Sequence, residues 1–236
     1  MILAGKVRIA DEVADKPGRI YDEECSVRVI TDIHPYVSRG GIKLEHALKE
    51  FNISPSGKVA VDIGASTGGF TDCLLQRGIS KVFTVDVGYG QLDWKLQSDV
   101  RVVSLDRKNA RELGPDDIQE LVDLVVIDVS FISLKLIIPS AINVLKPRGD
   151  LIALVKPQFE VGKDEVENRG IIKDPQKHLS VLIELSSFMK KRGWPLINII
   201  ASPITGQKGN REFLIHCRAK GNFLIVDEDH IRNKIN

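Results

Sequence analysis

The sequence lacks most features that mark membrane, secreted or metal-binding proteins. It contains no run of eighteen or more apolar residues, and its first residues form no signal-peptide pattern. Its three cysteines, Cys25, Cys73 and Cys217, are scattered and include no C-x-x-C pair. We therefore expect reduced thiols, no metal site, no membrane segment and a location in the cytoplasm.

Two common nucleotide-binding motifs are also missing. The sequence has no G-x-x-x-x-G-K-[ST] for a triphosphate. Where the NAD fingerprint G-x-G-x-x-G would stand, it reads Gly64-Ala65-Ser66-Thr67-Gly68-Gly69. Ser66 occupies the position of the glycine that lets the backbone approach a pyrophosphate. Both observations argue against a ligand bound through its phosphates.

The composition is otherwise that of an ordinary globular enzyme. The 236 residues are 43% hydrophobic and 28% charged, enough for one sizeable core and a small appendage. The net charge of +1 argues neither for nor against binding of nucleic acid. Between Lys190 and Lys220, however, seven basic residues accompany one acid, Glu212. This excess fits a phosphate-facing surface and fits equally the solvated ends of helices and strands.

Residues 59–75 carry the most informative motif, V-A-V-D-I-G-A-S-T-G-G-F-T-D-C-L-L. An apolar run containing Asp62, a turn of small residues and a helix-like pattern predict a strand, a glycine turn and a helix start. A second apolar run ends on Asp86, 22 positions after Gly64, where Rossmann-type units place a carboxylate for ribose hydroxyls. Any αβ protein can contain a glycine-rich turn, but turn and carboxylate together favour a ligand with ribose and adenine and no phosphate. S-adenosylmethionine (SAM) is the common ligand of this kind.

Strands and helices are predicted to alternate along most of the chain. Residues 1–33 alternate apolar and polar positions, as in short strands, but are too few to bury a core of their own. After a linker at 34–39, strands are expected at about 59–62, 82–86, 100–104, 121–128 and 151–156, with helices at about 40–51, 133–145 and 175–192. Residues 194–202 and 211–218 are expected to close the sheet as a hairpin. The fold class is therefore α/β, a doubly wound seven-stranded sheet over residues 40–222, with a tail at 223–236.

Four polar residues are predicted to meet at one edge of this sheet. Asp128 and Lys156 end apolar strands, at the edge where open parallel sheets bind ligands. Glu212 begins an antiparallel strand at the same edge, and Lys43 lies in the first turn of a helix that must start there. Strand-end charges are often merely solvated, so the argument depends on all four converging.

Five motifs resemble the TlyA family of ribosomal RNA 2′-O-methyltransferases, part of the FtsJ-like group. They are Y-V-S-R-G-G-I-K-L, V-D-I-G-A-S-T-G-G-F-T-D, V-I-D-V-S-F, L-V-K-P-Q-F-E and G-N-R-E-F-L, between about residues 36 and 220. The resemblance implies a class I SAM-dependent methyltransferase acting on ribosomal RNA, with cytidine as the expected nucleotide. It also implies a K-D-K-E tetrad at Lys43, Asp128, Lys156 and Glu212. Residues 1–33 resemble part of an S4-type RNA-binding domain, with Ala10-Asp11 where Asn-Gly is usual.

The resemblance and the predicted positions agree on the roles of the site residues. The turn would hold the methionine end of SAM; its residues are Asp62, Gly64, Ala65, Ser66, Thr67, Gly68, Gly69 and Phe70. Asp86 would bind the ribose, and Asp106 either accepts from the adenine amino group or is an ordinary loop carboxylate. Lys156 would remove the proton of the 2′-hydroxyl, and Lys43 would be a like charge or an anchor for the oxygen. Asp128 and Glu212 would orient the lysines, with Asp128 also near the sulfonium. Phe131 and Phe159 either wall the target nucleotide or belong to the core.

Three other functions are consistent with parts of the sequence. A methyltransferase for small molecules or proteins would use the same cofactor site. A cytolysin or haemolysin, a label also applied to this family, finds no support in a signal peptide, pore segment or membrane span. A non-catalytic RNA-binding module would not require the complete tetrad.

Overall fold

A computed structural model describes residues 7–10, 12–14, 16, 18–29, 34–162, 170–206, 208–221 and 223–235. The chain divides into two compact units, Met1–Pro35 and Tyr36–Asn236. The first unit contains an antiparallel sheet in the order β2-β1-β3, formed by β1 (Val7–Ile9), β2 (Glu12–Val13) and β3 (Val27–Val29). The short strands predicted for this region are confirmed. Asp11 and the turn residues Asp15 and Pro17 lie outside the described residues, and the S4-type identity stays a prediction.

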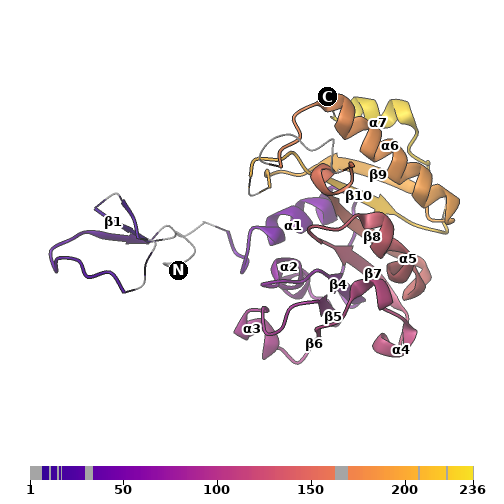
Figure 1. Ribbon diagram of the computed structural model, residues 1–236. Coiled ribbons are helices and arrows are strands. Elements are labelled where there is room, and N and C mark those ends of the chain that lie inside the picture. Colours follow the sequence, from indigo (N-terminus) through magenta and orange to yellow (C-terminus); the bar gives the residue numbers. More distant parts are fainter. Residues whose placement is uncertain are drawn as a thin grey trace. The chain divides into compact units, whose positions relative to one another are not determined.

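The second unit is built on a seven-stranded sheet in the order β6-β5-β4-β7-β8-β10-β9 (Figure 1). The strands are β4 (Val59–Ile63), β5 (Lys81–Asp86), β6 (Val102–Asp106), β7 (Val122–Ile127), β8 (Leu145–Val155), β9 (Leu196–Ala201) and β10 (Phe213–Cys217). Strands β6, β5, β4, β7 and β8 are parallel, and β10 runs antiparallel to both β8 and β9. The predicted α/β sheet with its terminal antiparallel hairpin is confirmed.

Helices cover both faces of this sheet (Figure 1). They are α1 (Gly40–Glu50), α2 (Gly69–Gln76), α3 (Trp94–Gln97), α4 (Pro115–Ile118), α5 (Leu134–Asn143), α6 (Pro175–Lys191) and α7 (Glu228–Ile235). Side chains alternate along a strand, so β7 contributes Val125 and Ile127 to the core under α5 and α6, and Leu124 and Val126 to the core under α1 and α2. As expected for a central parallel strand, β7 is buried on both faces.

Two boundaries differ from the sequence prediction for identifiable reasons. Strand β6 begins at Val102 instead of residue 100, because Val100 is exposed and Arg101 folds back on the carboxylate of Asp99. Strand β8 begins at Leu145 and runs through Lys146-Pro147-Arg148-Gly149, the segment expected only to end the preceding helix. Leu145 pairs with Val122 and Asp150 pairs with Leu124, so residues 146–149 lie within a register shift and have no partner in β7, which accommodates the proline.

Residues 223–235, expected as a tail, contain helix α7 and belong to the second unit. The N–H of Val226 donates to the carbonyl of Leu196 at 2.9 Å, and Ile231 is buried against the core. The helix is short and mostly polar, so its sequence shows little of the apolar periodicity that would have predicted it.

Candidate active site

The glycine turn after β4 requires its glycines for two physical reasons. Gly64 has φ of +81° and Gly68 has φ of +96°, a region that L side chains rarely adopt. A Cβ on Gly64 would lie 2.5 Å from the carbonyl oxygen of Asp128, and one on Gly68 would lie 2.3 Å from a methyl group of Leu96. Helix α2 starts directly after the turn, so its N-terminal N–H groups face the same edge of the sheet.

Asp62, in β4 just before the turn, is fully buried. Its Oδ2 accepts a hydrogen bond of 2.6 Å from Thr71 Oγ1, whereas its Oδ1 has no partner within the described part of the chain. Burial raises the pKa of Asp62 to about 7 against the effect of the Thr71 bond, and the charges of Asp128 and Asp86 add to the rise. A buried acceptor without a partner is a group that a polar ligand can satisfy.

Asp86 and Asp106 end the neighbouring strands β5 and β6 and lie opposite each other in the parallel register. The two oxygens of Asp86 accept the N–H groups of Ser66 and Gly88, each at 2.8 Å. Asp106 accepts the hydroxyl of Ser104 at 2.8 Å and the N–H of Gly90 at 3.1 Å. Each carboxylate oxygen has a second lone pair, so these bonds fix the carboxylates beside the turn and still allow them to accept from a ligand.

The other turn residues divide between exposed and buried positions. Ser66 and Thr67 are exposed at the edge, whereas the side chains of Ala65 and Phe70 pack in the core under α1 and α2. Ala65 and Phe70 would therefore contribute backbone rather than side chains to a ligand site. A Cβ on Gly69 would lie 2.2 Å from Ser38 Oγ, so this glycine allows the start of α1 to approach the start of α2.

The predicted tetrad forms two ion pairs. Lys43, in the first turn of α1, places Nζ 2.6 Å from Oε2 of Glu212, and both side chains are buried. Lys156 Nζ lies 2.6 Å from Oδ1 of Asp128, at an angle outside hydrogen-bond geometry, and donates to Ser130 Oγ at 2.8 Å. Sequence reasoning missed Ser130, although it stands in the motif V-I-D-V-S-F.

Sheet register brings the two ion pairs together. Val155 of β8 lies opposite Phe213 of β10, so Lys156 and Glu212 adjoin a paired position at the same edge. Strand β7, which leads into Asp128, is the other neighbour of β8. The structure therefore places three tetrad residues at the ends of three adjacent strands, and the fourth, Lys43, reaches them through Glu212.

Phe131 and Phe159 lie beside this group. Their ring centroids are 5.0 Å apart at an interplanar angle of 47°. Phe131 is 89% exposed and has φ of +65°, which is rare for an aromatic residue. Phe131 is thus not a core residue, and strained, exposed aromatics of this kind concentrate at functional sites.

The basic segment 190–220 does not form one surface. Lys190 and Lys191 lie in the last turn of α6, where positive charge stabilises a helix end. Arg211 precedes β10 and Arg218 follows it, so these two lie toward opposite ends of the strand. The helix-end alternative accounts for part of the segment.

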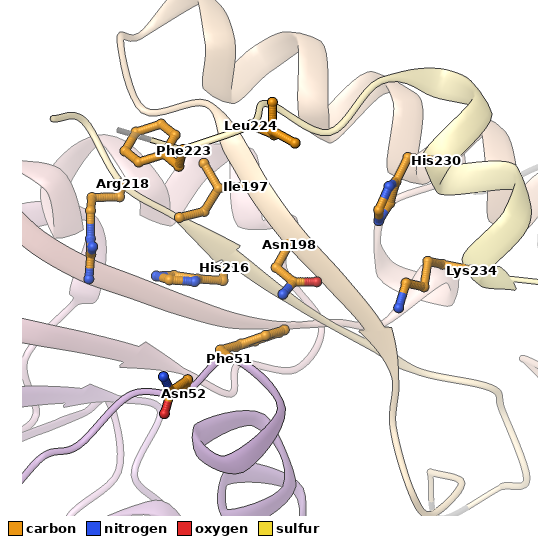
Figure 2. Close-up of a pocket in the computed structure, with 10 residues that line it drawn as sticks. All are labelled: Phe51, Asn52, Ile197, Asn198, His216, Arg218, Phe223, Leu224, His230 and Lys234. Atoms are coloured by element: carbon orange, nitrogen blue, oxygen red, sulfur yellow. The ribbon is translucent and has the colours of Figure 1, made fainter. Parts of the chain in front are cut away.

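The hollow drawn in Figure 2 is distinct from the candidate active site. Its volume is about 520 Å³, and its lining includes none of the predicted site residues. It lies toward the opposite edge of the sheet, because it contains Asn198 from early in β9 and His216 from late in the antiparallel β10. His216 stacks on Phe51, and its Nε2 lies 2.8 Å from Oδ1 of the buried carboxylate of Asp150.

Two classes of site find no candidate in the described parts of the chain. Among those residues, no group of three His, Cys, Asp or Glu side chains could hold a metal ion. No helix there is long and apolar enough to cross a membrane.

Comparisons with known proteins agree with this geometry. The family model described as FtsJ-like methyltransferase matches residues 36–219. The 16S/23S rRNA (cytidine-2′-O)-methyltransferase TlyA of Mycobacterium tuberculosis is 44% identical over 93% of this chain and 82% of its own length. A solved structure from Streptococcus thermophilus that carries a hemolysin name is 41% identical, with a TM-score of 0.84 over 99% of this chain and 86% of that one.

A more distant structure shows the fold alone. It comes from Listeria monocytogenes, is described as an S-adenosylmethionine-dependent methyltransferase, and is 17% identical with a TM-score of 0.56 over 78% of this chain and all of that one. The predicted methyltransferase class and Rossmann-like sheet are confirmed. The chain belongs to the FtsJ-like methyltransferase family.

Proposed function

We propose that this protein methylates a ribose 2′-hydroxyl of ribosomal RNA, with SAM as methyl donor and cytidine as the expected nucleotide. The observation that carries the proposal is the pair of ion pairs, Lys43–Glu212 and Lys156–Asp128, at the sheet edge that also holds the glycine turn. The printed name of the M. tuberculosis relative supports the substrate and the reaction.

The residues at the turn fit SAM. The partnerless Oδ1 of Asp62 is a buried acceptor beside the turn, and Asp86 presents a carboxylate that a ribose hydroxyl can reach. Gly64 and Gly68 let the turn pack against Asp128 and Leu96, where a Cβ would clash, and so fix its shape at the sheet edge. When bound, SAM supplies a methyl group attached to a positively charged sulfur. We propose that residues 64–70 hold its methionine end, Asp86 its ribose and Asp106 its adenine.

Lys156 is the proposed general base. A ribose hydroxyl is a weak nucleophile, so its proton must leave as the oxygen attacks, and a lysine accepts that proton only in its neutral form. Asp128 and Ser130 hold Lys156 Nζ at a fixed place at the edge. Lys43, held by Glu212 in the adjacent ion pair, would anchor the 2′-oxygen. Holding the hydroxyl and the base at the distance and orientation that the reaction needs supplies much of the remaining rate acceleration.

The experiment is methylation of ribosomal subunits that lack 2′-O-methyl groups. The chain is incubated with labelled SAM and either small or large subunits, and the labelled nucleotide is mapped. We expect label on a cytidine ribose, at a rate that falls at least about 10²-fold when Lys156→Ala replaces the wild type. Label on a base, or label confined to small molecules or proteins, would overturn the proposal. Lysis of erythrocytes by protein free of nucleic acid would support the cytolysin alternative instead.

A further inference from the structure

Glu160 connects two loops of the candidate active site. It follows the 3₁₀ turn Pro157–Phe159, which begins directly after Lys156. Its Oε2 accepts a hydrogen bond of 2.6 Å from Ser133 Oγ, and its Oε1 accepts one of 2.7 Å from the N–H of Leu134. Both donors belong to the start of α5, which follows β7 and the loop that carries Asp128.

These bonds hold two segments, 128–134 and 156–160, to each other on either side of Lys156. We call this pair of connected segments the bracket. The segment 128–134 carries Asp128, Ser130 and Phe131, and the segment 156–160 carries Lys156 and Phe159. The two segments also touch through the Lys156–Asp128 ion pair, the Lys156–Ser130 hydrogen bond and the pair of phenylalanine rings. Glu160 adds a further connection, and its two hydrogen bonds join the 156–160 segment to the start of α5.

An ordinary helix cap does not explain Glu160. Helix α5 already has its own N-cap residue, because Ser133 Oγ accepts the N–H of Lys135 at 3.2 Å. Glu160 follows the 3₁₀ turn after β8, is half-buried, and both of its carboxylate oxygens accept hydrogen bonds from this helix start. Burial raises the pKa of Glu160, and the hydrogen bonds from Leu134 and Ser133 at the helix start oppose that rise.

We propose that Glu160 is a positioning residue that holds Lys156 in register with Asp128, Ser130 and Phe131. The inference rests on the proposed role of Lys156. Its mechanism is geometric: both loops are held to α5, so the base cannot drift from the site of the incoming hydroxyl. Misplacement of a catalytic group by about 1 Å can cost about 10²-fold in rate.

The test compares Glu160→Ala with Glu160→Gln on ribosomal subunits. We expect Glu160→Ala to lower kcat by about 10²-fold, with the Kd for SAM within about twofold of wild type, since only positioning is lost. Glu160→Gln should recover most of the lost kcat, because its amide oxygen can accept from Leu134 and its amide nitrogen can donate to Ser133. Leu136→Ala is the matched control, because it truncates an exposed, uncharged side chain in the same turn of α5 and leaves both Glu160 bonds in place.

Two results in this assay would overturn the proposal. Glu160→Gln as inactive as Glu160→Ala would show that the negative charge itself acts. A lower Tm in Glu160→Ala with unchanged kcat per folded molecule would show a purely structural cap.

Hydrogen exchange tests the bracket without any substrate, and so separates this proposal from the proposed function. In Glu160→Ala, amides of both 128–134 and 156–160 should exchange faster together, and Leu136→Ala should leave the exchange of 156–160 unchanged. Faster exchange confined to the first turn of α5 would overturn the proposal even if the wild type methylates ribosomal RNA. If exchange behaves as expected but the wild type does not modify ribosomal subunits, the substrate assignment fails and the bracket stands.

Discussion

Replacing Asp62 with asparagine tests the electrostatics of the cofactor turn. Asp62 is fully buried, and its pKa is raised from 3.8 to about 7. The folded protein therefore binds this proton more tightly than the unfolded chain does. The stability linked to Asp62 is fully present below pH 3.8 and is lost as the pH rises toward about 7, above which the penalty stays constant.

The size of the effect follows from the size of the shift. About three pH units at 1.36 kcal/mol each give a penalty of about 4 kcal/mol above pH 7. Between pH 5 and pH 7, about 2 kcal/mol of this penalty should develop. Asp62→Asn cannot ionise, so its stability should lack this pH dependence. The amide leaves one buried polar group imperfectly paired, which costs roughly 1–3 kcal/mol at every pH and does not alter the slope.

Urea unfolding of wild type and Asp62→Asn at pH 5, 6, 7 and 8 measures the slope. We expect the free energy of unfolding of Asp62→Asn, relative to that of the wild type, to rise by about 3 kcal/mol from pH 5 to pH 8. Asp123→Asn is the control: burial alone would raise the pKa of Asp123, but hydrogen bonds from Lys146 and the N–H of Val59 lower it. The free energy of unfolding of Asp123→Asn should differ from that of the wild type by the same amount at every pH from 5 to 8. Parallel profiles for wild type and Asp62→Asn would refute a raised pKa at Asp62.

Three further predictions concern the cofactor and the RNA. Gly64→Ala should lose SAM binding and about 1–3 kcal/mol of stability in calorimetry and urea titration, because the new methyl group meets the Asp128 carbonyl at a strained φ; unaltered binding would contradict the close approach. Asp86→Ala should weaken SAM binding by about 1.5–3 kcal/mol, because it removes the acceptor for the ribose. Neither the wild type nor Asp86→Ala should bind NAD, because Ser66 stands where NAD-binding turns have a glycine beside the pyrophosphate. NAD binding without SAM binding by the wild type would overturn the cofactor assignment. Deleting residues 1–33 should weaken binding to ribosomal RNA and flatten its salt dependence, and equal affinities and slopes for the two chains would show that residues 34–236 suffice.

The positions of the tetrad could be predicted because they follow from topology. Apolar runs identify the strands, and in a parallel sheet every strand that ends in a polar residue delivers it to the same edge. Asp128, Lys156 and Glu212 follow from this rule, and the helix direction adds Lys43. The pairing within the tetrad could not be predicted, because it depends on which rotamers the packed side chains adopt.

Other features depend on tertiary contacts that have no local sequence signal. The hydrogen bond from Thr71 to Asp62 and the bonds from α5 to Glu160 join residues whose spacing in the sequence follows no general pattern. Helix α7 has few apolar positions and is stabilised by the sheet edge against which it packs. The sequence left two interpretations of the basic residues at 190–220 open, because only the fold shows that the end of α6 and the two ends of β10 are different places.

The rate of methyl transfer by Lys156→Arg tests the central claim most directly. Arginine keeps a positive charge beside Asp128 and Ser130 but stays protonated, so it cannot accept the hydroxyl proton. Single-turnover rates on ribosomal subunits at saturating SAM should fall about 10²–10⁴-fold in both Lys156→Ala and Lys156→Arg, with the Kd for SAM close to wild type. Near-normal turnover by Lys156→Arg would contradict the account, because Lys156 would then be a fixed charge and the proton would leave through Asp128, Glu212 or water.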